Sequence, residues 1–525
     1  MPELLTIKEA SKWATNYLKK RVTPSNISYL IQYGIVPKIG DNGTTQVDKA
    51  DLLEYYKNNN KTKEEQWKDK LGDDLNWTLS FAEYKEAETT KHVHRLHPYK
   101  GKFIPQLVEY FLDTHTDKFK KEVFFNKGDI ILDPFCGSGT TLVQANELGI
   151  HAIGIDVSAF NAHISNSKIG KYDLNLIEKT ARDISLKLKA FLKSRNNTKF
   201  EAELLEELKV FNAKYFPSPE FKYKVRQKEI NEKVYGQEKS KEFLPIYQKL
   251  IEKYNIELKQ DKSDTFLDKW FLKVVRDEID FVFEEIKKIK DVPTKRILSI
   301  VLSRTVRSCR ATTHSDLGTL IEPQTTTYYC KKHGKICKPL FSIENWWNRY
   351  TKDTIKRLAQ FDKLRTNTNQ ICLTGDSRKI DIVSVLEKKI PEFANKVKEQ
   401  KIDGIFSSPP YVGLINYHEQ HAYSYDLFGF ERNDDLEIGP LYKGQGREAR
   451  ESYVKGIAEV LLNSKKFLKE NYNVFLVAND KYGLYPKIAE MAGMKIVNQY
   501  KRPVLNRVEK DRNAYSEIIF HLKEK

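Results

Sequence analysis

The sequence predicts an α/β protein: a doubly wound sheet with a large, mainly helical insertion, preceded by a small helix-turn-helix-like module. The first observation is a buried strand, a glycine-rich turn, a helix and a second strand in succession over 128–157. The second is that further apolar, strand-like runs return late in the chain, at 369–376, 401–410, 471–480 and 514–522. The third is the Lys/Glu-rich stretch from about 170 to 295, whose helical period predicts the insertion.

Length and charge narrow the class of protein. A chain of 525 residues can hold two to four domains and bury large cores without disulfides. Its 89 Lys+Arg against 72 Asp+Glu give a formal charge of +17, which favours a polyanionic partner such as nucleic acid, although basic surfaces also serve solubility. Five scattered cysteines fit a reducing compartment. No apolar run of membrane-spanning length and no signal-peptide pattern occurs, so we expect a cytoplasmic protein without a membrane partner.

Residues 1–60 are expected to form a small module. Helical patterns at 4–14 and 23–34, the second capped by Thr23 with Pro24 at its first position, precede a turn at 40–43 and the pattern at 49–58. This order resembles a winged helix-turn-helix of the excisionase type, which implies DNA binding, with Asn26 as a candidate contact. A helical lid on the main domain is the alternative. The polar, charged sequence that follows predicts a linker over 61–90.

The glycine-rich turn predicts a ligand site. In ILDPFCGSGTT a strand runs into Asp133, Pro134 and Phe135, and then through Gly137 and Gly139 into a helix. Glycines let a ligand approach the free N–H groups at a helix start. Asp156 ends the next strand, where a carboxylate can bind two ribose hydroxyls. Together they predict a nucleoside-containing cofactor. No Gly-Lys-Ser/Thr and no third glycine follow, which disfavours a phosphate loop and a dinucleotide site; a turn that only packs a helix on a strand remains the alternative.

DPFCGSGTT followed by GIDVS, the later SSPPY and the upstream HPYKGKFIPQLVEYF resemble the DNA amino-methyltransferases, the S-adenosylmethionine-dependent cytosine-N4 and adenine-N6 enzymes of restriction–modification systems. The motifs cover about 94–165 and 370–415. The resemblance implies a Rossmann-like class I methyltransferase sheet. Its cofactor half would span 91–170 and its catalytic half 366–525, with the insertion, a candidate for target recognition, over 171–365.

The same resemblance implies the residues that hold S-adenosylmethionine. The glycine turn would hold the methionine part, Asp156 the ribose and Asp376 the adenine amino group, while Lys102 and Phe103 would pack over the cofactor from the upstream segment. The full set of implied cofactor contacts is Asp133, Pro134, Phe135, Gly137, Gly139, Thr140, Asp156, Asp376, Lys102 and Phe103. For Asp376 a simple turn aspartate that caps a loop is an equally good interpretation.

SSPPY has the chemistry of a catalytic loop. An exocyclic amino nitrogen is a poor nucleophile because its lone pair is delocalised, and acceptors for both amino hydrogens would help it to pyramidalise. Ser408 and the carbonyl of Pro409 supply such acceptors, Pro410 stiffens the loop, and Tyr411 offers a face on which an extruded base can stack. A rigid turn without catalytic function is the alternative. Further on, His418 and His421 could contact the base or backbone, but aromatic residues at helical spacing more often pack in a core.

In the resembled family, Ser before Pro-Pro tends to accompany cytosine-N4 methylation. We therefore expect a site-specific DNA methyltransferase that modifies the N4 atom of cytosine in double-stranded DNA, with a restriction endonuclease of the same system as a possible partner. The alternatives are adenine-N6 methylation at the same site, RNA base methylation, and a DNA-binding regulator with an inactive methyltransferase fold.

The insertion carries two further patterns. RTVRSCRATTH brings together Arg304, Arg307 and Arg310, which suit phosphate and guanine contacts. YYCKKHGKICKP then supplies Cys330, His333 and Cys337, with Cys309 or His314 as a fourth ligand for a structural zinc ion. A set of reduced, partly buried thiols is the competing interpretation. Many members of the family place their recognition segment between the third strand and the catalytic loop, and here the insertion comes earlier.

Overall fold

The computed structural model describes residues 3–40, 45–59, 67–68, 70–71, 75–262, 264–314, 320–505 and 514–525. The chain forms two compact units. Unit 1 consists of Met1–Gln66, Lys187–Ile279 and Ser308–Ile343, and unit 2 of Trp67–Leu186, Asp280–Arg307 and Glu344–Lys525. The segment expected as one insertion is thus shared between the two units. No helix in the described ranges is long and apolar enough to cross a membrane.

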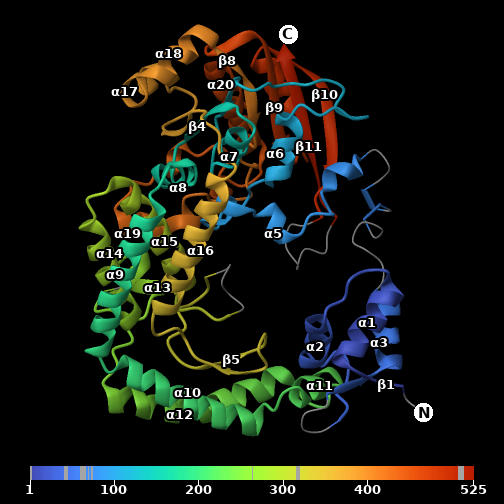
Figure 1. The fold of residues 1–525 in the computed structure, drawn as a ribbon, viewed down its shortest axis with the longest axis vertical. Coiled ribbons are helices and arrows are strands. Elements are labelled where there is room, and N and C mark those ends of the chain that lie inside the picture. Colours follow the sequence, from blue (N-terminus) through green and yellow to red (C-terminus); the bar gives the residue numbers. More distant parts are fainter. Residues whose placement is uncertain are drawn as a thin grey trace. The chain divides into compact units, whose positions relative to one another are not determined.

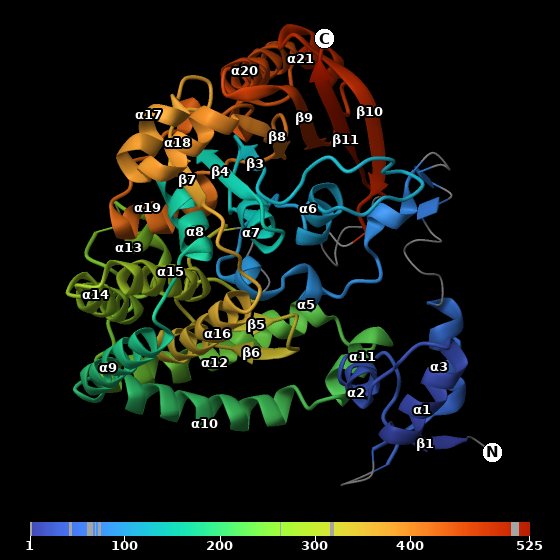
Figure 2. The same cartoon turned by 45° about the horizontal axis from the view of Figure 1, so that its top comes forward.

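Unit 2 is built on a seven-stranded sheet in the order β10-β11-β9-β8-β3-β4-β7 (Figures 1 and 2). The strands are β3 (Ile130–Asp133), β4 (His151–Asp156), β7 (Gln370–Thr374), β8 (Ile402–Ser407), β9 (Leu468–Ala478), β10 (Met494–Pro503) and β11 (Ser516–Glu524). β11 runs antiparallel to both of its neighbours, and the remaining pairs are parallel. This mostly parallel sheet, covered by helices on both faces, confirms the predicted Rossmann-like α/β class.

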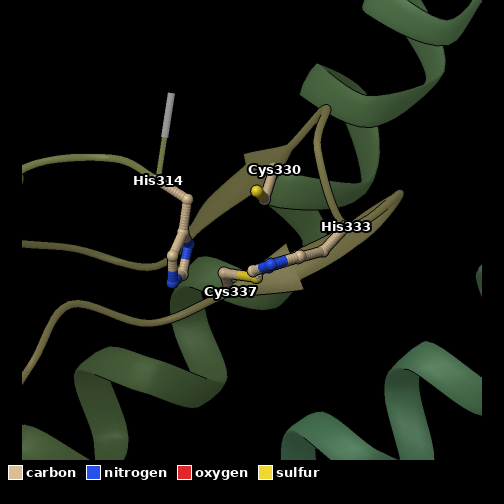
Figure 3. Close-up of side chains that lie close together, drawn as sticks. All are labelled: His314, Cys330, His333 and Cys337. Carbon is tan, nitrogen blue, oxygen red and sulfur yellow. Dashed lines mark hydrogen bonds between the residues drawn. The ribbon is translucent and has the colours of Figure 1, made fainter. Parts of the chain in front are cut away.

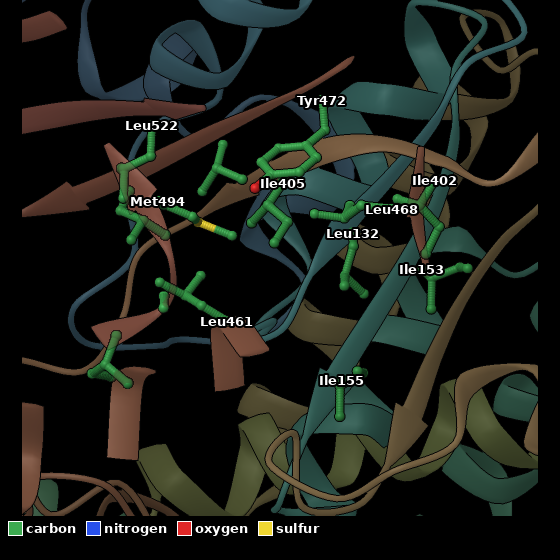
Figure 4. Packing of buried hydrophobic residues seen from close by; sticks show 14 of the residues in the cluster. Leu132, Ile153, Ile155, Ile402, Ile405, Leu461, Leu468, Tyr472, Met494 and Leu522 are labelled. Atoms are coloured by element: carbon green, nitrogen blue, oxygen red, sulfur yellow. The ribbon is translucent and has the colours of Figure 1, made fainter. Parts of the chain in front are cut away.

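The two faces of the sheet carry separate cores because successive strand residues point to opposite sides. Ile130 and Leu132 of β3 belong to one core, and Ile131 between them belongs to the other. The first core also includes residues of α17 (Ile382–Lys389), α18 (Pro391–Gln400), α20 (Arg447–Lys465) and α21 (Tyr485–Met491). Figure 4 shows Leu132, Ile153 and Ile405 of the strands packed in this core. The second core includes residues of α6 (Pro105–Leu112), α7 (Thr140–Glu147) and α8 (Ala159–Ile169).

The other elements of unit 2 are shorter helices and parts of the expected insertion. They are η1 (Trp77–Ser80), α5 (Glu86–Thr89), η2 (His92–Arg95), α15 (Val292–Ser308), α16 (Glu344–Asp362), η3 (Glu419–His421), α19 (Ala422–Phe428), η4 (Asp434–Leu436) and η5 (Leu441–Lys443). α9 (Leu174–Lys193) and α14 (Lys273–Lys287) each span the boundary between the unit 1 and unit 2 segments. Residues 75–90, which the sequence suggested as linker, are ordered elements of unit 2, with Leu79 and Phe81 in its second core.

Unit 1 begins with the small module. Its elements are β1 (Leu4–Thr6), α1 (Ile7–Leu18), α2 (Pro24–Gln32), β2 (Gln46–Asp48) and α3 (Lys49–Asn58). Thr23 caps α2 with Pro24 at its first position, which confirms that prediction. Leu4–Thr6, expected as helix, is a strand that pairs antiparallel with β2, so the first helix begins at Ile7. Of the turn expected at 40–43, only Gly40 lies among the described residues.

The regular structure in the other described residues of unit 1 consists of helices and one small hairpin. The helices are α10 (Asn197–Tyr215), α11 (Glu220–Arg226), α12 (Glu232–Tyr254) and α13 (Phe266–Trp270). β5 (Tyr328–Cys330) and β6 (Lys335–Cys337) form an antiparallel two-stranded ladder. Asn212 of α10 holds this hairpin: its amide group donates to the carbonyl of Ile336 at 3.0 Å and accepts from the Ile336 N–H at 2.8 Å.

Candidate active site

A pocket in unit 2 lies at the carboxyl ends of four neighbouring strands. It encloses about 870 Å³ of empty space, its open mouth included. Residues that follow β3, β4, β7 and β8 all line it, where open α/β sheets bind ligands. The predicted cofactor and catalytic residues that line it are Pro134, Phe135, Gly137, Thr140, Asp156, Asp376, Lys102, Phe103, Ser408 and Pro410.

The glycine turn has a conformation that only glycine adopts easily. Gly137 and Gly139 have φ values of +51° and +75°. A Cβ atom at Gly139 would lie 2.9 Å from the side chain of Ser165, so the turn packs too closely for alanine. Within the turn, Ser138 lines the pocket, and its buried hydroxyl has no hydrogen-bond partner within the described ranges. The turn therefore carries a polar group whose hydrogen-bonding capacity the described residues leave unused.

Asp133 lies under this turn and does not line the pocket. Its carboxylate accepts hydrogen bonds from the Phe135 N–H at 3.2 Å and from the Ser407 hydroxyl at 2.5 Å. Burial raises its pKa to about 6, against the effect of these hydrogen bonds. Asp133 thus ties the glycine turn to the strand that precedes the SSPPY loop, and it is a positioning residue for both.

Asp156 lines the pocket and is held by the glycine turn and by the residues that follow β4. Its carboxylate accepts hydrogen bonds from the N–H groups of Gly137 at 2.9 Å and Ser158 at 2.8 Å, and from the Asn161 amide at 3.1 Å. Burial is the largest influence and raises its pKa to about 6, while the hydrogen bonds counteract it. Asp156 is therefore charged at neutral pH, and its fixed carboxylate can accept ribose hydroxyls.

Asp376 reaches the pocket from the end of β7. Both of its carboxylate oxygens accept from the guanidinium of Arg378 at 2.9 Å. Burial opposes ionisation, but the hydrogen bonds from Arg378 outweigh it and hold the pKa of Asp376 below its ordinary value. The carboxylate is thus anchored beside the pocket, and its Oδ1 also accepts from the Arg378 N–H at 3.0 Å, which is the contact expected of an aspartate that caps a turn.

The SSPPY loop leaves β8 beside the glycine turn. The Ser408 hydroxyl donates to the carbonyl of Val477 at 3.1 Å. Because its proton is used in this hydrogen bond, its oxygen can only accept a hydrogen bond from a further partner. Pro410 lines the pocket, whereas Pro409 and Tyr411 do not. The Tyr411 hydroxyl donates to the carboxylate of Glu517 on β11 at 2.9 Å, which anchors the ring.

The segment at 97–111 contributes Tyr99, Lys102 and Phe103 to the pocket wall. The ammonium of Lys102 donates to the carbonyl of His94 at 2.7 Å, and burial, with the nearby guanidinium groups of Arg95 and Arg357, lowers its pKa to about 8. Its charge is directed at the protein, so Lys102 contributes to the wall chiefly through its aliphatic stem.

Sequence reasoning missed part of the site. Tyr99 lies inside a quoted motif, and a Cβ atom at Gly137 would lie only 3.0 Å from its hydroxyl. His418 lines the pocket instead of packing only in a core, and its Nδ1 contacts the carboxylate of Glu437, which lines the pocket too. His421 is buried outside the pocket lining, in agreement with the core interpretation. No local pattern marks Glu437, because its contacts with the backbone N–H and the ring of His418, nineteen residues earlier in the chain, place it at the pocket.

The candidate DNA contacts differ in their surroundings. Asn26 is exposed, but its side chain completes the cap of α2 by accepting from the N–H and hydroxyl of Thr23 at 2.8 and 2.7 Å. Arg304 is only 7% exposed, pairs with Asp353 at 2.6 Å and stacks on Tyr350, so its guanidinium faces the protein interior and not solvent. Arg307 and Arg310 are partly exposed.

The cysteine–histidine candidates need one correction. His314, Cys330, His333 and Cys337 place a ligand atom each within 4.8 Å of one another. Cys309, named in the sequence as a candidate ligand, is buried outside this cluster. Cys309 directly follows α15, five residues before His314, and its side chain is packed in the core. His314 is therefore the fourth member of the cluster.

The sheet, the pocket and its acidic and Ser-Pro-Pro residues define an α/β enzyme that binds a nucleoside-containing cofactor. Residues 10–167 match the family of N6/N4 methyltransferases described as DNA methylase. The type II methyltransferase M.MjaII of Methanocaldococcus jannaschii is 47% identical over 525 aligned residues, which cover 99% of this chain and 97% of that protein.

Two other relatives match shorter segments. The type II methyltransferase M.BsoBI of Geobacillus stearothermophilus is 35% identical over 19% of this chain and 18% of its own length. The type II methyltransferase M.MvaI of Kocuria varians is 26% identical over 23% of this chain and 25% of its own length. The chain belongs to the type II DNA methyltransferases of the N4/N6 amino-methyltransferase family. It is accordingly an enzyme that uses S-adenosylmethionine and acts on DNA.

Proposed function

We propose that this enzyme methylates the exocyclic N4 of a cytosine flipped out of double-stranded DNA. The observation that carries the proposal is the position of Ser408, which opens Ser-Pro-Pro-Tyr on the wall of the pocket that also contains Asp156. In the family that the chain resembles, serine at this place tends to accompany cytosine-N4 transfer. The structure agrees with the acceptor chemistry, because the Ser408 proton is engaged by Val477.

The pocket fits S-adenosylmethionine by its own groups. Ser138, Asn161 and Asp156 line it, and the buried Ser138 hydroxyl and Asn161 amide oxygen have no hydrogen-bond partner among the described residues. We assign the glycine turn to the methionine part, Asp156 to the ribose hydroxyls and Asp376 to the adenine amino group. Phe103 and the stem of Lys102 cover the cofactor. When bound, the cofactor supplies the electrophilic methyl group.

The remaining residues act on the base. The Ser408 hydroxyl and the Pro409 carbonyl accept the two amino hydrogens, which lets the nitrogen pyramidalise and frees its lone pair. The ring of Tyr411, held by Glu517, stacks on the extruded base. Pro410 keeps the loop rigid and shields the reacting nitrogen from water. The extra amino proton is lost to solvent after transfer.

The proposed reaction also implies a substrate, a partner protein and a cellular location. Double-stranded DNA is the substrate, and the charge of +17 favours its binding. We further propose that the described parts of the small module and of the former insertion segments contain the sequence-reading surface. A restriction endonuclease with the same target is the expected companion, and the cytoplasm is the expected location.

The test is to express the chain in cells that lack DNA methylation and to sequence their DNA with a method that distinguishes N4-methylcytosine from N6-methyladenine. N4-methylcytosine at one short sequence is the expected result. N6-methyladenine at such a sequence would replace the proposal with the adenine alternative. Unmodified DNA, combined with measurable S-adenosylmethionine binding by the purified protein, would support an inactive regulator, and methylated RNA alone would point to an RNA enzyme.

A further inference from the structure

A second cluster of ligating side chains lies in unit 1, which does not contain the methyl-transfer pocket. Cys330 ends β5, His333 lies in the following turn, Cys337 ends β6, and His314 comes from the segment before the hairpin. Figure 3 shows the four side chains pointing toward one another. Their ligand atoms all lie within 4.8 Å of one another. We propose that these four residues bind one Zn²⁺ ion, which holds the hairpin together.

The distances between the ligand atoms suit a tetrahedral site that closes slightly around the ion. Zn–S bonds of about 2.3 Å and Zn–N bonds of about 2.0 Å place the ligand atoms of a tetrahedron about 3.5 Å apart. Nδ1 of His333 already lies 3.4 Å from Sγ of Cys337. Two thiolates and two imidazoles are a preferred zinc set, and the two thiolate charges balance the ion.

The turn between Cys330 and His333 has the form that brings two ligands to one ion. The N–H groups of His333 and Gly334 donate to the carbonyl of Cys330 at 3.1 and 2.7 Å. Gly334 has a φ of +62°, which lets the chain turn back into β6 immediately after the histidine. The Cys-Lys-Lys-His-Gly sequence therefore forms a tight knuckle, with Cys337 on the opposite strand as the third ligand.

His314 has a neighbour that fixes its ring. The Tyr328 hydroxyl lies 2.7 Å from Nδ1 of His314 and accepts from the backbone N–H of His314 at 3.1 Å. If Nδ1 carries the ring proton and donates it to the tyrosine oxygen, Nε2 presents its lone pair to the metal. Such an outer hydrogen bond is the usual arrangement around metal-binding histidines.

The hairpin has only a small apolar cluster of its own among the described residues. Each strand has three residues, so the ladder depends on support from outside its own hydrogen bonds, part of which comes from Asn212 of α10. In the cluster formed by Tyr328, Cys330 and Cys337, two of the three side chains are thiols, which the proposed ion would join. A closed site with four protein ligands leaves no position for a reacting water, so the ion is structural and takes no part in methyl transfer.

The first test is the metal content of the full-length protein purified without chelators under reducing conditions. About one zinc ion per chain is expected by mass spectrometry of the metal. Replacing the zinc with Co²⁺ should give the visible absorption of tetrahedral cobalt and the ultraviolet charge-transfer absorption of two thiolates. Less than a fifth of a zinc per chain together with no tetrahedral cobalt absorption, or a Cys330–Cys337 disulfide in the freshly purified protein, would overturn the proposal.

Variants separate ligation from packing. Cys337→Ala and His333→Ala should lose most of the zinc, whereas Cys309→Ala, a matched change of a buried thiol outside the cluster, should keep it. His333→Cys preserves four ligands, so it should retain zinc and show the stronger cobalt charge transfer of three thiolates. Equal zinc loss in Cys309→Ala and Cys337→Ala, or no spectral change in His333→Cys, would contradict the assigned ligands even if some variants fold poorly.

Discussion

Unit 2 and unit 1 place their polar chemistry in different ways. In unit 2 the pocket residues follow parallel strands whose carboxyl ends meet at one edge, and large cores on both faces of the sheet hold those strands. In unit 1 the cysteines and histidines converge on a hairpin whose own cluster has three residues. The comparison teaches that the pocket of unit 2 is a product of its fold, whereas the zinc site that we propose in unit 1 would itself help to stabilise the local fold.

The largest effect is expected from Ser408→Ala, which removes a proposed acceptor from a pocket that the sheet keeps in place. We expect kcat to fall by about 10²- to 10³-fold with the Kd for S-adenosylmethionine unchanged within about twofold. Single-turnover methylation and calorimetry measure the two. The control is Ser464→Ala, because that hydroxyl also donates to a main-chain carbonyl, at 2.8 Å, but outside the pocket. A large loss of cofactor affinity in Ser408→Ala would mean that the loop also shapes the cofactor site.

Asp156→Ala should produce the complementary defect in the same unit. Loss of a buried, charged acceptor for ribose hydroxyls should raise the Kd for S-adenosylmethionine roughly 10- to 100-fold. Titration calorimetry measures it, and Asp381→Ala, which removes only the cap of α17, is the matched control. An unchanged Kd would show that the ribose binds elsewhere.

A smaller effect is expected from pH. Since burial raises the pKa of Asp156 to about 6, the carboxylate that accepts the ribose is mostly protonated below that value. Cofactor affinity should therefore be about tenfold weaker at pH 5 than at pH 7.5. Asp376 should not add to this change, because Arg378 holds its pKa below its ordinary value. The affinity of Asp156→Asn for S-adenosylmethionine should be lower but should vary little between pH 5 and pH 7.5. If the affinity of the variant depended on pH as strongly as that of the unmodified enzyme, the titrating group would be another one.

The smallest effect is expected in unit 1, from Glu278→Gln. Glu278 accepts from the Ser342 hydroxyl and the Ile343 N–H at 2.9 and 2.8 Å, and burial raises its pKa from 4.5 to about 8. The fold thus favours the protonated acid, so the stability it contributes is complete below pH 4.5 and is lost as pH rises toward 8.

A neutral glutamine keeps the acceptor and should raise the free energy of unfolding of unit 1 by about 1–2 kcal/mol at pH 8, with little change at pH 5. Thermal unfolding of the full-length protein at both pH values measures this, and Glu206→Gln on the exposed face of α10 is the control. A stabilisation of the same size at both pH values would exclude ionisation as the cause.

The sequence allowed more to be predicted in unit 2 than in unit 1. The glycine turn, Asp156, Asp376 and Ser408 each follow an apolar run directly, so the strand pattern alone places them at one sheet edge. β10 escaped prediction because it is an edge strand whose buried and exposed residues do not alternate regularly. Glu437 and Tyr99 escaped it because contacts across loops, which leave no periodic trace, bring them to the pocket.

In unit 1 the residues that matter are joined by side chains and not by strands. Spacing alone favoured Cys309 and His314 equally as partners of the hairpin, and only the fold shows that Cys309 is buried in a core while His314 reaches the cluster. In unit 2, Arg304 looked like a DNA contact because its neighbours are basic, but its ion pair with Asp353 and its stacking on Tyr350 direct it inward.

The position of β7 has a consequence for how such enzymes diversify. After β4 the chain leaves the sheet, and it returns only at β7, an edge strand that pairs with β4 alone. The first part of the intervening segment, α8, packs on the sheet and places Asn161 at the pocket, but the parts that belong to unit 1 can lengthen or shorten without shifting the register of any strand pair. The catalytic machinery can therefore be inherited intact while those parts change.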